Sequence, residues 1–153
     1  MIQRIQTVYL LVAALLSLLT AFLTIVTFVP EQGEAFCMTA LHIQDANQAE
    51  ITGFPVWTIL VFDICAILLS IIAIFGYKNR KKQMRTTRSA ILANILTIVV
   101  AACAVYATMR SFNFTLQPGF ALFTALLAPV SNYLAYKGIK HDEKLVRDAD
   151  RIR

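Results

Sequence analysis

Residues 78–88 read KNRKKQMRTTR, and they carry six of the fourteen Lys and Arg residues in this 153-residue chain. Two apolar segments, residues 56–76 and 89–108, lie on either side of them. Basic residues of membrane proteins concentrate in cytoplasmic loops, so a polybasic turn between two apolar segments fixes the direction in which the protein faces. The stretch therefore predicts a helical hairpin that places its turn in the cytoplasm.

Four apolar segments make up most of the chain, and we predict a helix for each. They span residues 7–29, 56–76, 89–108 and 118–136, with an outer loop at 30–55 and a tail at 137–153. The chain is 58% hydrophobic and 15% charged, whereas soluble domains are about 45–50% apolar and about 25% charged. A helix needs about 20 apolar residues to cross the ~30 Å hydrocarbon core of a bilayer. The pattern predicts one domain, residues 1–153, with an all-α fold: an integral membrane antiparallel four-helix bundle.

The distribution of basic residues predicts the orientation of this bundle. Arg4, the six residues of the central stretch and six in the tail fall on one side, and Arg110 alone falls on the other. This ratio places both termini in the cytoplasm and the acidic loop 30–55 outside. We expect a multi-pass protein of the bacterial inner membrane with a short cytoplasmic C-terminal helix. Positive-inside loops also account for the net charge of +5, and no nucleic-acid motif accompanies that charge.

Motifs in the chain give no reason to expect catalysis, a cofactor or a bound metal. Its three cysteines have no CxxC spacing, and its two histidines lie outside the apolar segments. The sequence contains no HExxH, GxSxG or glycine-rich phosphate loop. A cleaved signal peptide is also disfavoured, because residues 7–29 are too long for an h-region and lack a cleavage site.

Small or weakly polar residues recur every three or four positions in each apolar segment. In residues 118–136, for example, they are Ala121, Ala125, Ala128, Asn132 and Ala135. This spacing puts each set on one face of its helix, and small faces let membrane helices approach closely. We therefore expect a tightly packed bundle.

Three polar residues in these faces, Ser70, Asn94 and Asn132, are predicted to form one layer. Each lies five or six residues from the expected cytoplasmic end of its helix, which is a depth of about 9 Å at ~1.5 Å per residue. Hydrogen bonds between helices are expected there. We interpret them as a packing clasp in preference to part of a polar path.

Asp63 is the one carboxylate within a predicted span, where such a residue costs roughly 2.5–3.5 kcal/mol and is a functional candidate. It follows Trp57 by six residues, close to the expected outer surface. We predict an intramembrane pair between Asp63 and Arg110, with Tyr106 and Thr24 completing the hydrogen bonds. A paired Asp63 would be structural, and an unpaired one would indicate proton or cation coupling. The pair is the preferred interpretation.

The basic residues of the central stretch are predicted to contact anionic lipid headgroups, each contributing ~1 kcal/mol. They are Lys78, Arg80, Lys81, Lys82, Arg85 and Arg88. The tail carries charge pairs at i,i+4 that favour a helix, with Leu145, Val146, Ala149 and Ile152 on a narrow apolar face. Two interpretations of the tail stay open: it contacts the membrane or a partner, or it is a solvated extension of the fourth helix.

The two ends of the chain carry a family likeness. MIQRIQTVYLL (residues 1–11) and KHDEKLVRDADRIR (residues 140–153) resemble an uncharacterised family of small four-span proteins of the Bacteroidota, catalogued as a domain of unknown function. The likeness covers essentially the whole chain, and Arg4 and Asp150–Arg151 are its most specific residues. It implies an inner-membrane location and four helices, and it carries no assigned activity, cofactor or catalytic residue. We also expect Arg4 to pair with an acidic residue of the tail.

These observations predict a non-enzymatic integral inner-membrane protein that is a structural or accessory subunit of a membrane assembly. Its expected partners are a bilayer with anionic headgroups and either another membrane protein or a second copy of the chain. The alternative is a small proton- or cation-coupled transporter that uses Asp63, which rests on an analogy of architecture with small four-span exporters.

Overall fold

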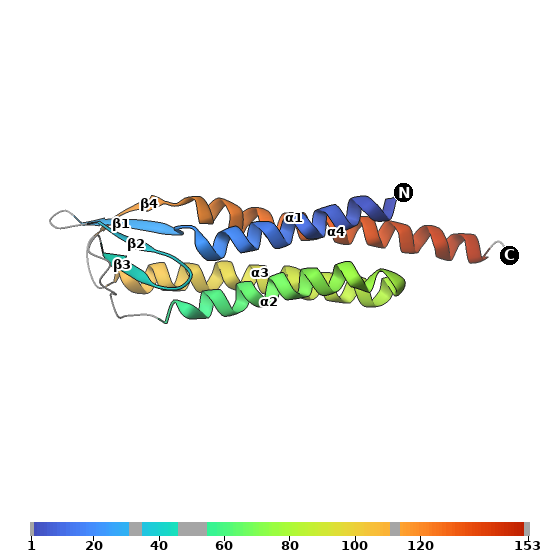
Figure 1. Cartoon of the computed structure of the whole chain (residues 1–153), viewed down its shortest axis with the longest axis horizontal. Coiled ribbons are helices and arrows are strands. Elements are labelled where there is room, and N and C mark those ends of the chain that lie inside the picture. The colour runs from blue at the N-terminus through green and yellow to red at the C-terminus, as the bar shows by residue number, and fades with distance from the viewer. Residues whose placement is uncertain (1, 31–34, 46–54, 111–113, 152–153) are drawn as a thin grey trace.

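The computed structural model describes residues 2–30, 35–45, 55–110 and 114–151, in which four long helices form a bundle with a small sheet at one end (Figure 1). The helices are α1 (Ile2–Phe22), α2 (Trp57–Phe75), α3 (Arg80–Met109) and α4 (Phe120–Arg151), with a 3-10 turn η1 (Gly76–Lys78) between α2 and α3. The strands are β1 (Val26–Pro30), β2 (Phe36–Met38), β3 (Ile43–Asp45) and β4 (Phe114–Pro118). The prediction of four helices is confirmed, but the all-α prediction missed the sheet.

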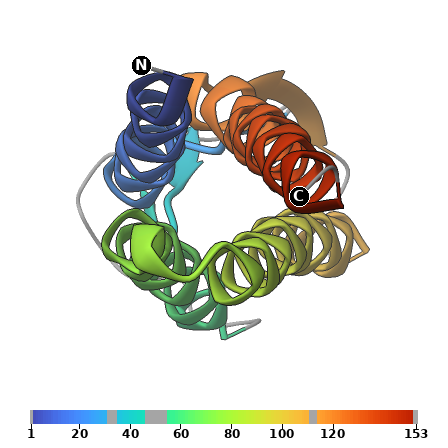
Figure 2. The same cartoon turned by 90° about the vertical axis from the view of Figure 1, so that its right-hand side faces the viewer.

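The four helices stand at the corners of a square when viewed along the bundle (Figure 2). α1 packs against α2 and α4, and α3 packs against the same two helices. Neighbouring helices run in opposite directions, so the bundle is antiparallel (Figure 1). Each helix therefore turns one face to the bundle axis and the opposite face outward.

Small side chains fill the bundle, and large apolar side chains cover its outside. Fully buried along the axis are Ala13, Ala66, Ala73, Ala90, Ala104, Ala121, Ala128 and Ala135. Exposed side chains include many Leu, Ile, Val and Phe residues of all four helices. A water-soluble bundle would show the reverse pattern. Three segments, Ile5–Phe22, Trp57–Phe75 and Arg80–Met109, are long and apolar enough to cross a membrane.

The sheet is antiparallel, with strand order β3-β2-β1-β4. β1 pairs Val26 with Met38 of β2 on one side and with Pro118 of β4 on the other. Phe28 and Phe36 stack across β1 and β2 with ring centroids 5.0 Å apart. The inner face of the sheet thus closes one end of the bundle with a core that includes Phe28, Met38 and Ile59.

The predicted end of the first helix is wrong. It was placed at residue 29, but α1 ends at Phe22 and residues 26–30 form β1. Residues 24–29 are β-branched or aromatic, which favours a strand once a partner strand is present. The predicted outer loop 30–55 likewise contains β2 and β3, and the connection before the fourth helix contains β4. Hydropathy alone does not separate an apolar strand from the end of an apolar helix.

The junction between β4 and α4 lies directly against the end of α1. Gly119 donates its backbone N–H to the carbonyl of Ile25 at 2.9 Å, and Ala121 donates to the carbonyl of Thr24 at 3.1 Å. A Cβ atom on Gly119 would lie 2.1 Å from the carbonyl oxygen of Thr24. Glycine is therefore required here for close approach of two backbone segments.

The basic stretch was predicted to be a turn, but from Arg80 onward it forms the beginning of α3. The turn itself is η1 with Asn79, whose side chain accepts the N–H of Lys82 at 3.1 Å and caps the helix. The helix then starts at Arg80, nine residues before the predicted start at Ser89. Lys, Arg, Gln and Met are strong helix formers, so the residues that set the charge pattern also continue the helix.

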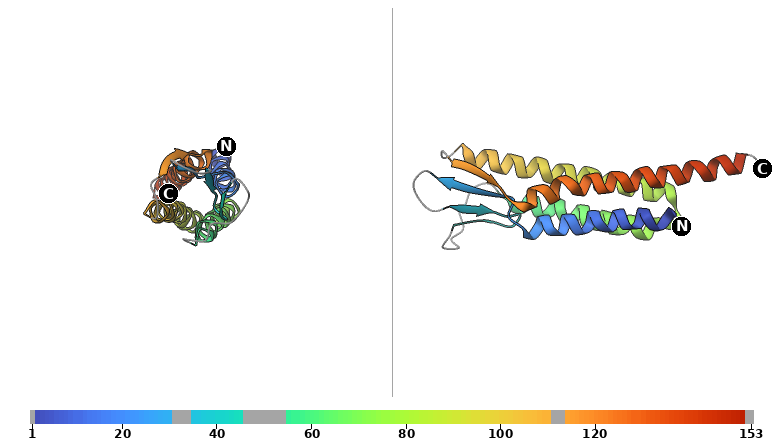
Figure 3. Two further views of the ribbon diagram at one scale, coloured as in Figure 1. Left: turned by 90° about the vertical axis from the view of Figure 1, so that its left-hand side faces the viewer. Right: turned by 90° about the horizontal axis from the view of Figure 1, so that it is seen from above.

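The fourth helix and the tail are one element. The helix predicted at 118–136 and the separate C-terminal helix are a continuous α4 that runs from Phe120 to Arg151. Its C-terminal part projects past the N-terminus of α1 and past η1 (Figure 3). The tail is therefore a helical continuation of the fourth helix, and its contact with the membrane or a partner stays a prediction.

Candidate functional site

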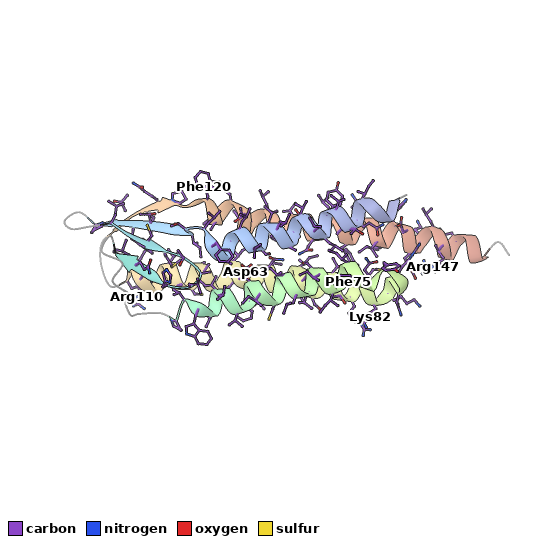
Figure 4. All side chains as sticks on the ribbon, viewed as in Figure 1. Asp63, Phe75, Lys82, Arg110, Phe120 and Arg147 are labelled. Carbon is purple, nitrogen blue, oxygen red and sulfur yellow. The ribbon has the colours of Figure 1, made fainter. Side chains whose placement is uncertain are left out.

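Asp63 lies inside the bundle, on the face of α2 that points toward the axis (Figure 4). Its exposed fraction is 1%. Ser17 of α1 interacts with this carboxyl, but the hydroxyl of Ser17 donates its hydrogen to Asn94 Oδ1 at 2.9 Å. Among the described side chains, Asp63 Oδ2 is the one buried polar atom without a hydrogen-bond partner. A buried oxygen in that condition keeps its desolvation cost without compensation.

Asp63 and Arg110 do not form the predicted pair. Arg110 is exposed at the end of α3, near the sheet, and no hydrogen bond or ion pair between described residues joins it to Asp63 (Figure 4). Tyr106 is 64% exposed and points away from the interior. Thr24 contributes its backbone carbonyl to the junction with α4. The four predicted members of this site are therefore not brought together.

Helix lengths explain why the pair fails. Asp63 precedes Gly76 by thirteen residues, and Arg110 follows Arg80 by thirty. At ~1.5 Å per residue, Asp63 lies about 20 Å and Arg110 about 45 Å from the turn between α2 and α3. An axial offset of about 25 Å is too long for an arginine side chain to span. Because α3 starts earlier than predicted, Arg110 lies farther from Asp63 than an inward-reaching side chain was expected to cover.

The predicted polar layer is two separate contacts that cross the bundle diagonally. Asn132 Nδ2 of α4 donates to the hydroxyl of Ser70 of α2 at 3.3 Å, and that hydroxyl donates to the backbone carbonyl of Ala66 at 2.9 Å. Asn94 lies deeper and accepts from Ser17, because α3 begins earlier than predicted. The prediction that Ser70, Asn94 and Asn132 share one layer is therefore wrong for Asn94. These contacts join opposite helices of the square, so they fix both diagonals of the bundle.

A second polar cluster, absent from the sequence predictions, surrounds a cavity of about 440 Å³ at the end of the bundle opposite the sheet. We call it the inner cavity; its polar lining comes from Gln6, Thr7, Tyr77, Arg80, Gln83 and Asp142. Gln6 Nε2 donates to Asp142 Oδ2 at 2.6 Å, and Arg80 Nη1 donates to the backbone carbonyl of Asp142 at 2.8 Å. Gln83 Nε2 donates to the backbone carbonyl of Ala73 at 3.0 Å. These bonds connect all four helices at one level.

The inner cavity had a signal in the sequence. Gln83, Thr87, Ala90, Asn94 and Thr97 follow one another at spacings of three and four, and all are buried. Extending the small face of the third helix by two turns would have placed Gln83 inside the bundle. Nothing in the sequence marked Asp142, which lies among charged tail residues but is only 7% exposed. The predicted contact between Arg4 and the tail falls on a side chain outside the described residues.

The predicted headgroup-contacting residues lie around the same end of the bundle. Lys81, Lys82, Arg85 and Arg88 are exposed on the first turns of α3, and Arg88 also donates to the hydroxyl of Tyr136 at 3.0 Å. Arg80 differs, because it is half-buried and turned toward Asp142. The side chain of Lys78 lies outside the described residues. No group of three or more His, Cys, Asp or Glu residues that could hold a metal ion occurs in the described part of the chain.

Comparison with known families gives one match, and it covers nearly the whole chain. The chain belongs to the family described as Domain of unknown function (DUF4293), whose sequence model matches residues 2–152. The predicted membership of an uncharacterised family is confirmed. No curated protein matches the chain.

Proposed function

We propose that this member of an uncharacterised family is a four-span protein of the bacterial inner membrane and a non-enzymatic accessory subunit of a membrane assembly. Three of its helices have the length and composition of membrane spans. α4 packs against α1 and α3 and bonds to α2 through Asn132, which supports a fourth crossing at the same depth. Phe120, Phe123, Leu126 and Leu127 are exposed on its outer side, as expected for a lipid-facing surface.

In the proposed orientation, both termini lie in the cytoplasm and the sheet lies outside. The start of α1, the end of α4 and the start of α3 lie at one end of the molecule (Figure 1). Of the thirteen Lys and Arg residues that the structure describes, twelve lie toward that end, and Arg110 near the sheet is the exception. Such asymmetry supports an N-in, C-in orientation.

Cysteine labelling tests this orientation. In a chain whose three natural cysteines are replaced by alanine, Leu41→Cys and His141→Cys place single thiols at exposed positions on opposite ends. A membrane-impermeant maleimide is expected to label Leu41→Cys in intact spheroplasts and His141→Cys only after the membrane is permeabilised. Labelling of His141→Cys in intact spheroplasts would contradict the proposed orientation.

The projecting end of α4 is the observation that carries the accessory role. Leu145 and Val146 are 51% and 44% exposed on a helix that extends past the rest of the bundle (Figure 3). Lys144 and Arg147 flank them and are also exposed. Helices that present apolar side chains between charged ones commonly bind partner proteins. The bundle interior, in contrast, is filled by small side chains, which supports a scaffold in preference to a passage.

Partner binding should depend on these two apolar side chains. We expect the Leu145→Gln, Val146→Gln double variant to lose co-purifying protein by about tenfold or more after crosslinking in mild detergent, as for removal of an interface hot spot. Lys144→Gln is the matched control, because it changes an exposed neighbour and keeps the apolar pair. The proposal would be contradicted if the wild-type chain, the double variant and Lys144→Gln all recover the same partner equally. It would also be contradicted if the wild-type chain is recovered without any partner.

A second candidate function is proton- or cation-coupled transport, and the environment of Asp63 favours it. The carboxyl is buried, lacks the predicted arginine partner and leaves Oδ2 without a hydrogen bond. Ionisable groups retained inside membrane bundles commonly serve proton or ion transfer. Flux measurements on the wild-type chain and Asp63→Asn in liposomes distinguish this function from the accessory role.

A further inference from the structure

The inner cavity contains two oppositely charged side chains, Arg80 and Asp142, that form no ion pair with each other among the described contacts. Arg80 donates to the backbone carbonyl of Asp142, and no described ion pair joins its guanidinium to the Asp142 carboxylate. A guanidinium has five N–H donors, and the Arg80 guanidinium donates one of them to a described acceptor. Asp142 uses Oδ2 for Gln6, and Oδ1 has no described partner. The cavity therefore offers a cationic donor group and an anionic acceptor group to a ligand.

The neutral residues of the cavity extend this division of roles. Gln6 and Gln83 use their amide nitrogens for Asp142 and Ala73, which leaves both side-chain carbonyl oxygens as acceptors. Gln6 and Gln83 are each 5% exposed, so hydrogen bonds and packing hold them in place. The cavity lining therefore supplies three oxygen acceptors, from Asp142, Gln6 and Gln83, which suit an ammonium group. It also supplies the guanidinium donors of Arg80, which suit a phosphate.

The location of the cavity indicates where such a ligand comes from. Phe75 and Tyr77 line it and are 75% and 56% exposed, and aromatic residues concentrate where lipid headgroups meet the hydrocarbon core. The exposed Lys81 and Lys82 lie on the next turn of chain. A volume of about 440 Å³ falls within the ~300–1,000 Å³ typical of small-ligand pockets. We propose that the inner cavity binds a phosphoethanolamine group, with the phosphate at Arg80 and the ammonium at Asp142, Gln6 and Gln83.

Charge balance separates this site from the basic surface around it. Arg80 and Asp142 sum to zero, so the cavity suits a zwitterion, whereas the exposed residues Lys81, Lys82 and Arg85 suit anionic headgroups. The group is either the headgroup of a phospholipid of the inner leaflet or a soluble phosphoethanolamine ester. Both sources share the chemistry that the cavity recognises.

Native mass spectrometry of the full chain tests the site. We expect the wild-type chain to bind phosphatidylethanolamine about tenfold more tightly than phosphatidylglycerol with identical acyl chains. We expect Arg80→Gln, which loses the phosphate contact, to bind phosphatidylethanolamine about tenfold more weakly than the wild-type chain does. Arg85→Gln is the matched control, because it removes the same charge from an exposed position of the same helix. Arg80→Lys keeps the cation without the planar fork and is expected to weaken binding less than Arg80→Gln does.

Asp142→Asn provides a sharper outcome, since it keeps an oxygen for Gln6 and leaves the cavity with a net positive charge. We expect it to reverse the preference and bind phosphatidylglycerol more tightly. Displacement of the lipid by soluble glycerophosphoethanolamine would assign the site to a soluble ester, and its failure to compete would assign the site to the lipid. Equal wild-type affinity for the two lipids, or equal losses in Arg80→Gln and Arg85→Gln, would overturn the proposal. If Asp142→Asn does not fold, the comparison of Arg80→Gln with Arg85→Gln still decides it.

Discussion

Replacing Gly119 with alanine is expected to destabilise the chain by at least about 3 kcal/mol, because a new Cβ would collide with the backbone that links α1 to β1. That atom would lie 2.1 Å from the carbonyl oxygen and 2.8 Å from the carbonyl carbon of Thr24. Backbone atoms do not rotate away as a side chain would. The carbonyls of Thr24 and Ile25 are also held by hydrogen bonds from Ala121 and Gly119. Relief of the collision therefore requires the link between α1 and β1 to move away from the start of α4, which breaks these hydrogen bonds.

Gly76→Ala is the control for this prediction. A Cβ at position 76 would find its nearest neighbour, Gln83, at 3.8 Å. The backbone there has φ −73° and ψ 8°, which alanine adopts without strain. We expect this variant to keep the wild-type stability within about 1 kcal/mol. The stability of both variants is measured as the thermal unfolding midpoint of the detergent-solubilised chain, followed by gel filtration. Equal midpoints for Gly119→Ala and Gly76→Ala would contradict the role given to Gly119.

Much of the fold follows from features that hydropathy detects directly. Runs of apolar residues about 20 long and small residues at helical spacing predicted four helices and a packed interior. The sheet escaped prediction because residues 24–29 are as apolar as the helix before them. Their β-branched and aromatic character becomes decisive only when β4, some ninety residues later, supplies a partner strand. Pairing over such a distance has no local signal.

The candidate site was predicted less well than the fold, and one boundary explains most of the difference. Starting the third helix at Ser89 instead of Arg80 shifted the expected depth of every later residue in α3. Asn94 was therefore predicted at the level of Ser70, and Arg110 was predicted within reach of Asp63. Charge led to the misplacement, because the basic residues indicated a loop although the Lys, Arg, Gln and Met residues of this stretch favour a helix. The burial of Asp142 depends on Gln6, at the other end of the chain, and that contact is tertiary.

Replacing Asp63 with asparagine is expected to leave the bundle folded and to raise its free energy of unfolding by about 2 kcal/mol. The substitution keeps the volume of the side chain and replaces an ionisable carboxyl, whose Oδ2 has no partner, with an amide that cannot carry a buried charge. Arg110→Gln is expected to change stability by less than about 0.5 kcal/mol, since Arg110 is exposed. Reversible unfolding in mixed micelles measures both single variants and the double variant. Their effects should add within about 0.5 kcal/mol, because the two sites lie far apart.

Loss of stability in Asp63→Asn that Arg110→Gln restores would contradict this expectation and reinstate the ion pair. The same variant also separates the two candidate functions. A carboxyl kept at a cost to stability indicates a role beyond packing, and removing such a group characteristically raises stability while it abolishes activity. If the chain carries protons or cations, Asp63→Asn should be more stable and should give no flux in liposomes. If the chain is an accessory subunit alone, neither chain gives flux, and Asp63→Asn should retain the partner that depends on Leu145 and Val146.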